Sequence, residues 1–215
     1  TLCSYHKTFL GAARKGLLPK PRCIVYTNLT CDANLLTFRA LADFYQIPLF
    51  FIDVPMQQSE ADVSYVAGQL KDLGRFLETN TGKTIDESSL KARLSLSRKT
   101  LKAYAKFQKQ RADKYIPTDL VTPLYAGMTN NILLGTKEEA RYVNMLLRDC
   151  KHASPAKGSR IYWMHTIPFW SEAVRRSLYF NEKAQIVGCE LAEVCEPDFD
   201  PEKPYDAMAR RMVYH

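Results

Sequence analysis

A strand, helix and strand pattern between Arg22 and Pro55 constrains the fold more than any other feature of this 215-residue sequence. Cys23–Thr27 and Leu49–Asp53 are short runs rich in β-branched and aromatic residues, and Asp32–Tyr45 carries apolar residues at helical spacing between them. A unit of this kind has a right-handed crossover, which makes its two strands parallel. The sequence therefore predicts the start of an α/β domain.

Amphipathic helices follow with no strand between them. The apolar stripe over residues 62–79 ends near Gly82, a residue typical of a helix C-cap. A second helix is predicted to begin after Asp86, and a third after a capping box formed by Thr136 and Glu139. We expect these helices to form a helical subdomain or insertion.

The alternation of strands and helices returns after residue 158. Strand-like segments at 160–164 and 185–189 flank a helix-like segment at 169–180, and another helix begins at Tyr205. This second unit is unfinished, so we expect the sequence to be a fragment of a longer polypeptide. The predicted fold is α/β: a Rossmann-like parallel-sheet domain with a helical insertion, then the start of a second Rossmann-like domain. The predicted segments are 1–60, 61–152 and an incomplete 153–215.

The composition excludes several classes of protein. Hydrophobic residues make up 46% and charged residues 25% of the chain, which are globular averages. No run approaches the roughly 18 apolar residues of a membrane span. The sequence therefore excludes a disordered, collagen-like or membrane-spanning chain. Because the first residues lack the basic stretch and apolar core of a signal peptide, we expect a cytoplasmic protein.

The charge and the cysteines are less specific. The net charge of +7 is spread along the chain, with its densest basic run between Lys99 and Lys114. Such a run is typical of a solvated helix face, and it would also attract a polyanion. Six cysteines without a C-x-x-C pair or a secretory signal indicate thiols or metal ligands instead of a disulfide framework.

Two cysteines are candidate site residues. Cys31 stands where the first strand ends and the next helix begins, with Asp32 as the expected cap. Ligands of open parallel sheets gather at the carboxyl ends of strands, and helix amides there favour a thiolate. Cys3 begins a predicted short helix, Ser4–Lys15. The loops that hold Cys3 and Cys31 can converge on one site. The alternative is that Cys31 is a small buried residue near a turn.

His165 occupies a similar place in the second unit, just after a strand and just before Pro168. An imidazole there can polarise a carbonyl, hold a phosphate or move a proton, and we take His165 as a candidate substrate-binding residue. The alternative is that it only ties down its loop. His6 has a weaker pattern. The sequence contains no Walker-type loop, dinucleotide-binding glycine motif, zinc-protease motif or nucleophile elbow.

Several segments together resemble one known family, the 2-hydroxyacyl-CoA dehydratase D-component family. This family includes subunits of 2-hydroxyglutaryl-CoA dehydratase and of the ATP-dependent benzoyl-CoA reductases. The resemblance covers nearly the whole chain and is carried by Leu2–Lys7 with Gly11, Tyr26–Asp32, Ile47–Pro55, Tyr65–Gly82 and Gly158–Ile161.

The resemblance implies a [4Fe-4S] cluster held between two Rossmann-like domains by cysteines from separate loops. Cys3 and Cys31 match the first two ligand positions. Neither Cys189 nor Cys195 matches the third, which we expect beyond the end of this chain. The fragment alone is therefore expected to be inactive.

The resemblance also implies a reaction and partners. It predicts a lyase subunit that removes water from a 2-hydroxyacyl-CoA through a ketyl radical, with a second dehydratase subunit and an ATP-dependent activator protein as partners. The alternatives are a benzoyl-CoA reductase subunit and an electron-relay or scaffold paralogue. A nucleic-acid-binding module is disfavoured, because aromatic residues such as Phe50 and Trp163 lie in core-like strands instead of among the basic residues. We expect no nucleic-acid or membrane partner.

Overall fold

The chain divides into two compact units. Unit 1 comprises residues 1–90 and 202–215, and unit 2 comprises residues 91–201. The structure, a computed structural model, describes residues 3–29, 31–119, 121–194 and 199–214. Each unit is described by itself below.

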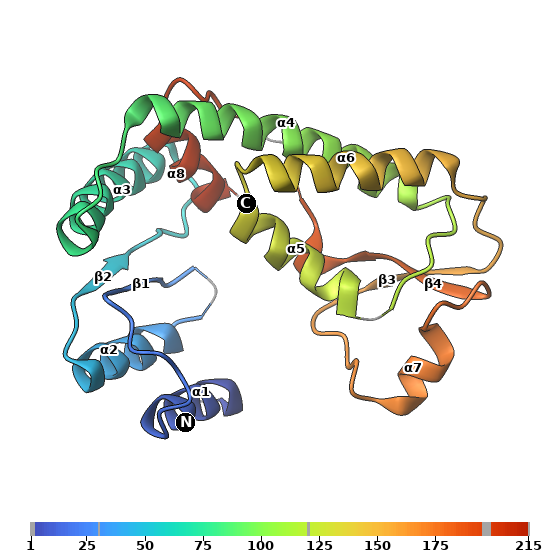
Figure 1. Ribbon diagram of the computed structural model, residues 1–215, viewed down its shortest axis with the longest axis horizontal. Helices are drawn as coiled ribbons and strands as arrows, with labels where there is room; N and C mark the ends of the chain where they lie inside the picture. Colours follow the sequence, from blue (N-terminus) through green and yellow to red (C-terminus); the bar gives the residue numbers. More distant parts are fainter. Residues whose placement is uncertain (1–2, 30, 120, 195–198, 215) are drawn as a thin grey trace. The chain divides into compact units, whose positions relative to one another are not determined.

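Short parallel strands and longer helices make up both units (Figure 1). Within the described ranges, no helix is both long and apolar enough to span a bilayer. In chain order the elements are α1 (Ser4–Arg14), β1 (Ile24–Thr27), α2 (Ala33–Tyr45), β2 (Leu49–Ile52), α3 (Glu60–Thr81), α4 (Glu87–Arg111), α5 (Val121–Leu133), α6 (Lys137–His152), β3 (Ser159–Trp163), α7 (Glu172–Leu178), β4 (Ala184–Cys189), the 3-10 helix η1 (Glu190–Ala192) and α8 (Pro204–Tyr214).

The predicted strand–helix–strand unit is present in unit 1. β1 pairs with β2 in parallel, with Ile24 opposite Leu49 and Thr27 opposite Ile52, and α2 connects the two strands. The parallel pairing and the mixture of helix and sheet confirm the α/β character. The finer Rossmann-like arrangement stays a prediction.

Helices cover both faces of the β1–β2 pair (Figure 1). Ile24 and Tyr26 of β1 are buried in a cluster with residues of α1 and α2. Ile52 of β2 is buried on the other face, with Val63 and Val66 of α3. Alternating residues of β2 therefore reach opposite cores, which explains why β2 is apolar along its length.

Side-chain caps fix several helix ends where the sequence predicts them. Asp86 accepts hydrogen bonds from the amides of Ser88 and Ser89 before α4. The Thr136 hydroxyl accepts from the Glu139 amide at 3.2 Å before α6. Gly82 closes α3 in the left-handed region, with a φ of 70°. These ends are set by local chemistry, so local sequence predicts them.

The last helix, α8, packs against α3 in unit 1. Ala209 and Val213 of α8 are buried against Val63 and Val66 of α3. The sequence pattern places the helix from Tyr205 onward in the segment that begins at residue 153. Its packing follows instead from the apolar stripe of α3, which α8 removes from water.

A polar contact also joins α8 to the start of α3. The Arg210 guanidinium donates to both carboxylate oxygens of Glu60, at 2.9 Å to Oε1, and also to Asp206. The Tyr214 hydroxyl donates to Glu60 at 3.1 Å. The hydrogen bond from Arg210 is the main reason that the pKa of Glu60 lies below its ordinary value.

We expect this contact to make unit 1 sensitive to acid. A carboxyl group with a lowered pKa in the folded state stabilises the fold above its unfolded pKa of about 4.3, and the stabilisation is lost as the pH falls through the folded pKa. Glu60→Gln should therefore show a smaller loss of stability between pH 7 and pH 3 than the wild type in urea unfolding. Glu172→Gln, which removes an exposed pair with Arg176 on α7, is the control and should leave the acid limb unchanged.

The strands of unit 2 are also parallel. β3 pairs with β4 from Ser159 opposite Ala184 to Trp163 opposite Cys189, with a register shift between Ile161 and Tyr162. A cluster that includes Ile186 and Cys189 of β4 packs with residues of α7 and of the segment before it. The two strands that the sequence predicts in this region are therefore confirmed.

A second core of unit 2 lies between α4 and α6. Tyr104 and Phe107 of α4 are buried with Val143 and Cys150 of α6. Burial raises the pKa of the Cys150 thiol, against a lowering by Lys114 and Arg111. Cys150 is therefore a core residue, consistent with its lack of a functional pattern in the sequence.

The start of β3 requires a glycine. A Cβ at Gly158 would lie 2.3 Å from the carbonyl carbon of Lys183 and 2.4 Å from the Glu182 carbonyl oxygen. Both atoms belong to the backbone just before β4, and the Ser159 amide donates to the Lys183 carbonyl at 2.8 Å. The close approach lets β3 begin beside β4.

Gly158→Ala should lower the free energy of unfolding by about 1–3 kcal/mol, because backbone must move to admit the methyl group. Gly68→Ala is the matched control. No atom lies within 4 Å of a Cβ at this helical position, so alanine should stabilise by up to about 1 kcal/mol. Chemical denaturation measures the free energy of unfolding of both variants. An unchanged free energy of unfolding in Gly158→Ala would contradict the close approach of Gly158 to the backbone before β4.

Candidate functional site

The two candidate cysteines lie at the starts of two packed helices of unit 1. Cys3 is the residue before α1, in an extended conformation, and its carbonyl accepts from the Lys7 amide at 3.2 Å. Cys31 lies just before α2, and its carbonyl accepts from the Asn34 amide at 3.0 Å. Both thiols are exposed and free, so the reading of Cys31 as a buried turn residue is wrong.

Asp32 occupies the N-cap position of α2, as predicted, but caps the helix differently. Its side chain makes no capping hydrogen bond, and its backbone is already helical. The amide of Leu35 bonds to the Asp32 carbonyl at 3.0 Å. A tight backbone turn therefore replaces the side-chain cap, and the Asp32 carboxylate stays exposed beside Cys31.

His6 joins the two helix starts. Its side chain is only 3% exposed, with Nε2 3.6 Å from the Cys31 sulfur and Nδ1 2.9 Å from the Thr37 hydroxyl of α2. The sequence pattern gave His6 little weight. The available signal was its spacing, because a residue three positions after Cys3 lies on the same side of a helix.

A polar clamp holds the carboxyl ends of β1 and β2 together. The Asn28 amide group donates to Asp53 Oδ1 at 2.9 Å, and its oxygen accepts from the Val54 amide at 2.9 Å. Gln69 of α3 donates to the Asp53 carbonyl at 2.7 Å and accepts from the Asp53 amide at 2.9 Å. The exposed Tyr65 hydroxyl donates to Asp53 Oδ2 at 3.3 Å. This clamp fixes the point from which the chain runs to Cys31.

Asn28→Asp should destabilise the protein by about 2–4 kcal/mol, because a carboxylate cannot donate to Asp53 and would repel it. Asn28→Ala removes the same bonds without the added charge and should cost less, about 1–3 kcal/mol. Asn144→Ala, on the exposed side of α6, should stay within about 0.5 kcal/mol of the wild type. Urea unfolding measures all three, and equal stabilities would show that the clamp contributes nothing.

His165 lies at the corresponding edge of unit 2, just after β3. The side chain is exposed and the backbone has a φ of 65°, a left-handed conformation that costs a non-glycine residue about 1 kcal/mol. The Glu190 carboxylate accepts from the His165 amide at 3.1 Å and so helps to hold this conformation. Among the predicted site residues, Cys3 and Cys31 therefore belong to unit 1 and His165 to unit 2.

The hydrogen bonds of His165 assign its neutral tautomer. The Thr166 amide donates to Nδ1 at 2.7 Å, so Nδ1 is an acceptor and the ring proton is on Nε2. Among the described residues, Nε2 has no hydrogen-bond partner. The exposed edge of His165 therefore presents a hydrogen-bond donor, which suits a carbonyl or phosphate oxygen.

The remaining cysteines do not join the candidate site. Cys189 is 2% exposed within the core of unit 2. Cys23 is half-buried immediately before β1. Cys195 lies outside the described residues. In the part of the chain that the structure describes, no group of three or more His, Cys, Asp and Glu side chains is arranged to hold a metal ion.

The basic run of α4 is only partly a solvated face. Lys102, Lys106 and Lys109 are exposed, as predicted. Arg111 instead donates to the Ile186 carbonyl of β4 at 2.7 Å. Burial lowers the pKa of its guanidinium, while Tyr104 and Glu193 act in the opposite direction. The end of the run thus supports the sheet of unit 2.

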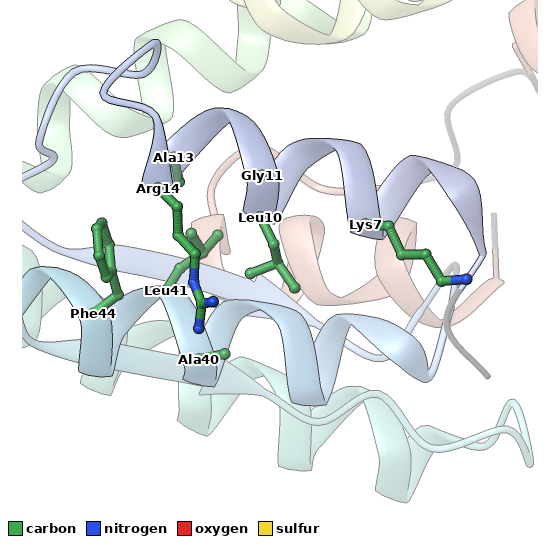
Figure 2. A pocket seen from close by; sticks show the side chains of 8 residues that line it. All are labelled: Lys7, Leu10, Gly11, Ala13, Arg14, Ala40, Leu41 and Phe44. Atoms are coloured by element: carbon green, nitrogen blue, oxygen red, sulfur yellow. The ribbon is translucent and has the colours of Figure 1, made fainter.

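A shallow pocket of about 380 Å³ lies between α1 and α2 (Figure 2). Its apolar part is formed by Leu10, Leu41 and Phe44, and its charged part by Lys7 and Arg14. Neither Cys3, Cys31 nor His6 lines it. The pocket is therefore a feature of the helix pair separate from the cysteines.

Comparison with known proteins gives consistent results. The family model described as 2-hydroxyglutaryl-CoA dehydratase, D-component, matches residues 1–215. The alpha subunit of (R)-2-hydroxyglutaryl-CoA dehydratase from Acidaminococcus fermentans is 31% identical over 97 residues, which is 43% of this chain and 20% of that protein. The alpha subunit of (R)-phenyllactyl-CoA dehydratase from Clostridium sporogenes is 24% identical over 157 residues, 67% of this chain and 38% of that protein. The matched segments thus cover well under half the length of these relatives.

Proposed function

Since the chain belongs to the 2-hydroxyglutaryl-CoA dehydratase D-component family, we propose that it is part of a lyase subunit that removes water from a 2-hydroxyacyl-CoA. The family match over residues 1–215 carries this proposal. Both relatives are named as dehydratases of 2-hydroxyacyl-CoA thioesters, which supports the same substrate class. Both are also named as alpha subunits, which supports a second dehydratase subunit as partner.

The chemistry of this substrate class requires more than an acid and a base. The hydrogen on the β-carbon of a 2-hydroxyacyl thioester is not acidic, so a base alone cannot start the elimination. Adding one electron to the thioester gives a ketyl radical anion, which expels the neighbouring hydroxide and leaves a radical whose β-hydrogen is acidic. Loss of that proton and of the electron gives the enoyl thioester. We place the reaction in this radical class, with an ATP-dependent activator protein as the electron source. Since ATP and CoA thioesters are cytoplasmic metabolites, we place the enzyme in the cytoplasm.

We further propose that Cys3 and Cys31 are ligands of a [4Fe-4S] cluster. Thiolates are the ligands that such clusters take, and both thiols are exposed where backbone amides at a helix start can hydrogen-bond sulfur. The donors fit in kind but not in number, because two thiols do not hold a four-iron cluster and no third ligand joins them among the described residues. These residues alone therefore do not form a complete cluster site.

His165 is our candidate for the substrate contact from unit 2. Its Nε2–H can donate to the thioester carbonyl or to a phosphate of coenzyme A, and its loop is held by Glu190 and Thr166. A donor at the carbonyl oxygen stabilises negative charge that develops there. The strained backbone at His165 is typical of positions where binding geometry outweighs local stability.

Iron analysis of the full-length protein tests the cluster proposal. Purified without oxygen, the protein should be brown, with roughly four iron and four sulfide per subunit. Cys31→Ser should lose the colour and most of the iron, whereas Cys23→Ser, at a half-buried position before β1, should keep both. A colourless, metal-free wild-type protein would contradict the proposed ligands and the dehydratase.

Activity measurements test the reaction itself. With the partner subunit, the activator and ATP, the protein should dehydrate at least one member of a panel of 2-hydroxyacyl-CoA esters. Reduction of benzoyl-CoA instead would reassign it to the benzoyl-CoA reductase branch. A brown complex that turns over no acyl-CoA would identify an electron-relay or scaffold subunit.

His165→Asn should raise the KM for the acyl-CoA about five- to tenfold, the effect of losing one hydrogen bond to substrate. Asparagine tolerates a positive φ and can still accept from the Thr166 amide, so the loop should be preserved. His152→Asn, at the exposed end of α6, is the control and should leave the KM unchanged. Steady-state kinetics measure the effect, and an unchanged KM in His165→Asn would exclude the proposed contact.

A further inference from the structure

We propose that His6 is a positioning residue that holds the sulfur of Cys31, with its ring fixed in turn by the hydroxyl of Thr37. The contacts within unit 1 carry this inference, and its importance for the enzyme rests on the proposed function of Cys31. It adds a residue that the sequence pattern did not select.

The burial of His6 makes its two hydrogen bonds necessary. The side chain is 3% exposed, so water cannot satisfy both ring nitrogens. Nδ1 lies 2.9 Å from Thr37 Oγ1 and Nε2 lies 3.6 Å from Cys31 Sγ, and both partners come from the start of α2. A buried polar group without a partner is costly, so these contacts hold the ring in one orientation.

The rings around His6 limit its movement further. Tyr5 meets the imidazole edge to face, with ring centroids 5.4 Å apart and an interplanar angle of 84°. Phe9, one turn along α1, packs against Phe38 of α2 with centroids 6.2 Å apart. Because these contacts fix α1 against α2, the distance between His6 and Cys31 is set by packing.

Thr37 makes the arrangement independent of the protonation state of the sulfur. When the hydroxyl donates to Nδ1, the ring proton is on Nε2 and is donated to a Cys31 thiolate. When the hydroxyl accepts from Nδ1–H, the Nε2 lone pair accepts the proton of a Cys31 thiol. A hydroxyl can play either role, so His6 remains bonded to the sulfur in both states.

Cys3 provides an internal comparison on the same chain. It is exposed, as Cys31 is, and it also stands at the start of a helix. Among the described residues, no side chain donates to or accepts from its sulfur. A contact specific to Cys31 should therefore change the behaviour of Cys31 and leave Cys3 unchanged.

The test uses a pair of substitutions that each replace one nitrogen of the imidazole. The amide nitrogen of glutamine reaches the place of Nε2, so His6→Gln can still bond the sulfur. The amide nitrogen of asparagine reaches only the place of Nδ1, so His6→Asn keeps the contact with Thr37 and loses the contact with Cys31. Both variants are neutral and polar, so a general effect of polarity or packing should not make Cys31 react more slowly in His6→Asn than in His6→Gln.

The readout is alkylation by iodoacetamide in the metal-free full-length protein, with the two cysteines quantified by peptide mass spectrometry. In this reaction the Cys31 sulfur bonds to the carbon of the reagent, iodide leaves, and the thiol proton passes to the buffer. A hydrogen bond donated to the sulfur from the place of Nε2 stabilises the negative charge of the reacting thiolate. In His6→Asn the rate at Cys31, relative to Cys3, should fall at least about fivefold, as expected for a lost hydrogen bond. In His6→Gln it should stay within about twofold of the wild type.

Thr37→Val keeps the imidazole of His6 and removes the hydroxyl that bonds to Nδ1. This variant replaces His6→Asn in the test if His6→Asn does not fold. Its rate at Cys31 should fall about two- to fivefold, between the two His6 variants. The deciding variant is His6→Asn, or Thr37→Val if His6→Asn does not fold. If its ratio of Cys31 to Cys3 alkylation rates equals that of the wild type, the inference is overturned and His6 is a packing residue. That result would leave the proposed dehydratase standing. The opposite outcome is a wild-type protein that contains no metal but whose ratio of Cys31 to Cys3 alkylation is higher than that of the variant. It would reject the cluster and keep the role of His6.

Discussion

The parallel pairing of β1 with β2 is the constraint from which the geometry of unit 1 follows. Parallel strands end at the same edge of a sheet, so Asn28 and Asp53 meet there and hydrogen-bond directly. The chain that leaves β1 must then reach α2 within a few residues, which places Cys31 at the start of that helix. α1 packs beside α2 and brings His6 into contact with Cys31 and Thr37.

Much of this framework could be predicted because it depends on neighbouring residues. The strands follow from runs of apolar residues, and the stripe of α3 follows from the spacing of Val63, Val66 and Leu70, all of which are buried. Capping by Asp86, Thr136 and Gly82 follows from residue types that satisfy helix ends within three positions. The place of Cys31 between β1 and α2 follows from the same local reading, whereas its exposure was left open by that reading and is shown by the structure.

The parts that could not be predicted depend on packing between distant segments. His6 and Cys31 are 25 residues apart, and their contact depends on how α1 lies against α2. Arg111 belongs to a basic run by sequence, yet its guanidinium bonds to a carbonyl 75 residues later. Glu60 and Arg210 are 150 residues apart, and only the packing of α8 on α3 brings them together. Periodicity identifies the faces of helices but does not name their partners.

The two histidines show how the environment of an imidazole decides its function. His6 is buried and both nitrogens have partners, so no nitrogen remains for a ligand and it can act only through Cys31 and Thr37. His165 is exposed, and a backbone amide occupies Nδ1 while Nε2–H has no partner among the described residues. A substrate oxygen needs the second kind of imidazole. The sequence places His165 after a strand, and the tautomer fixed by Thr166 supplies the physical reason for proposing it as the substrate contact.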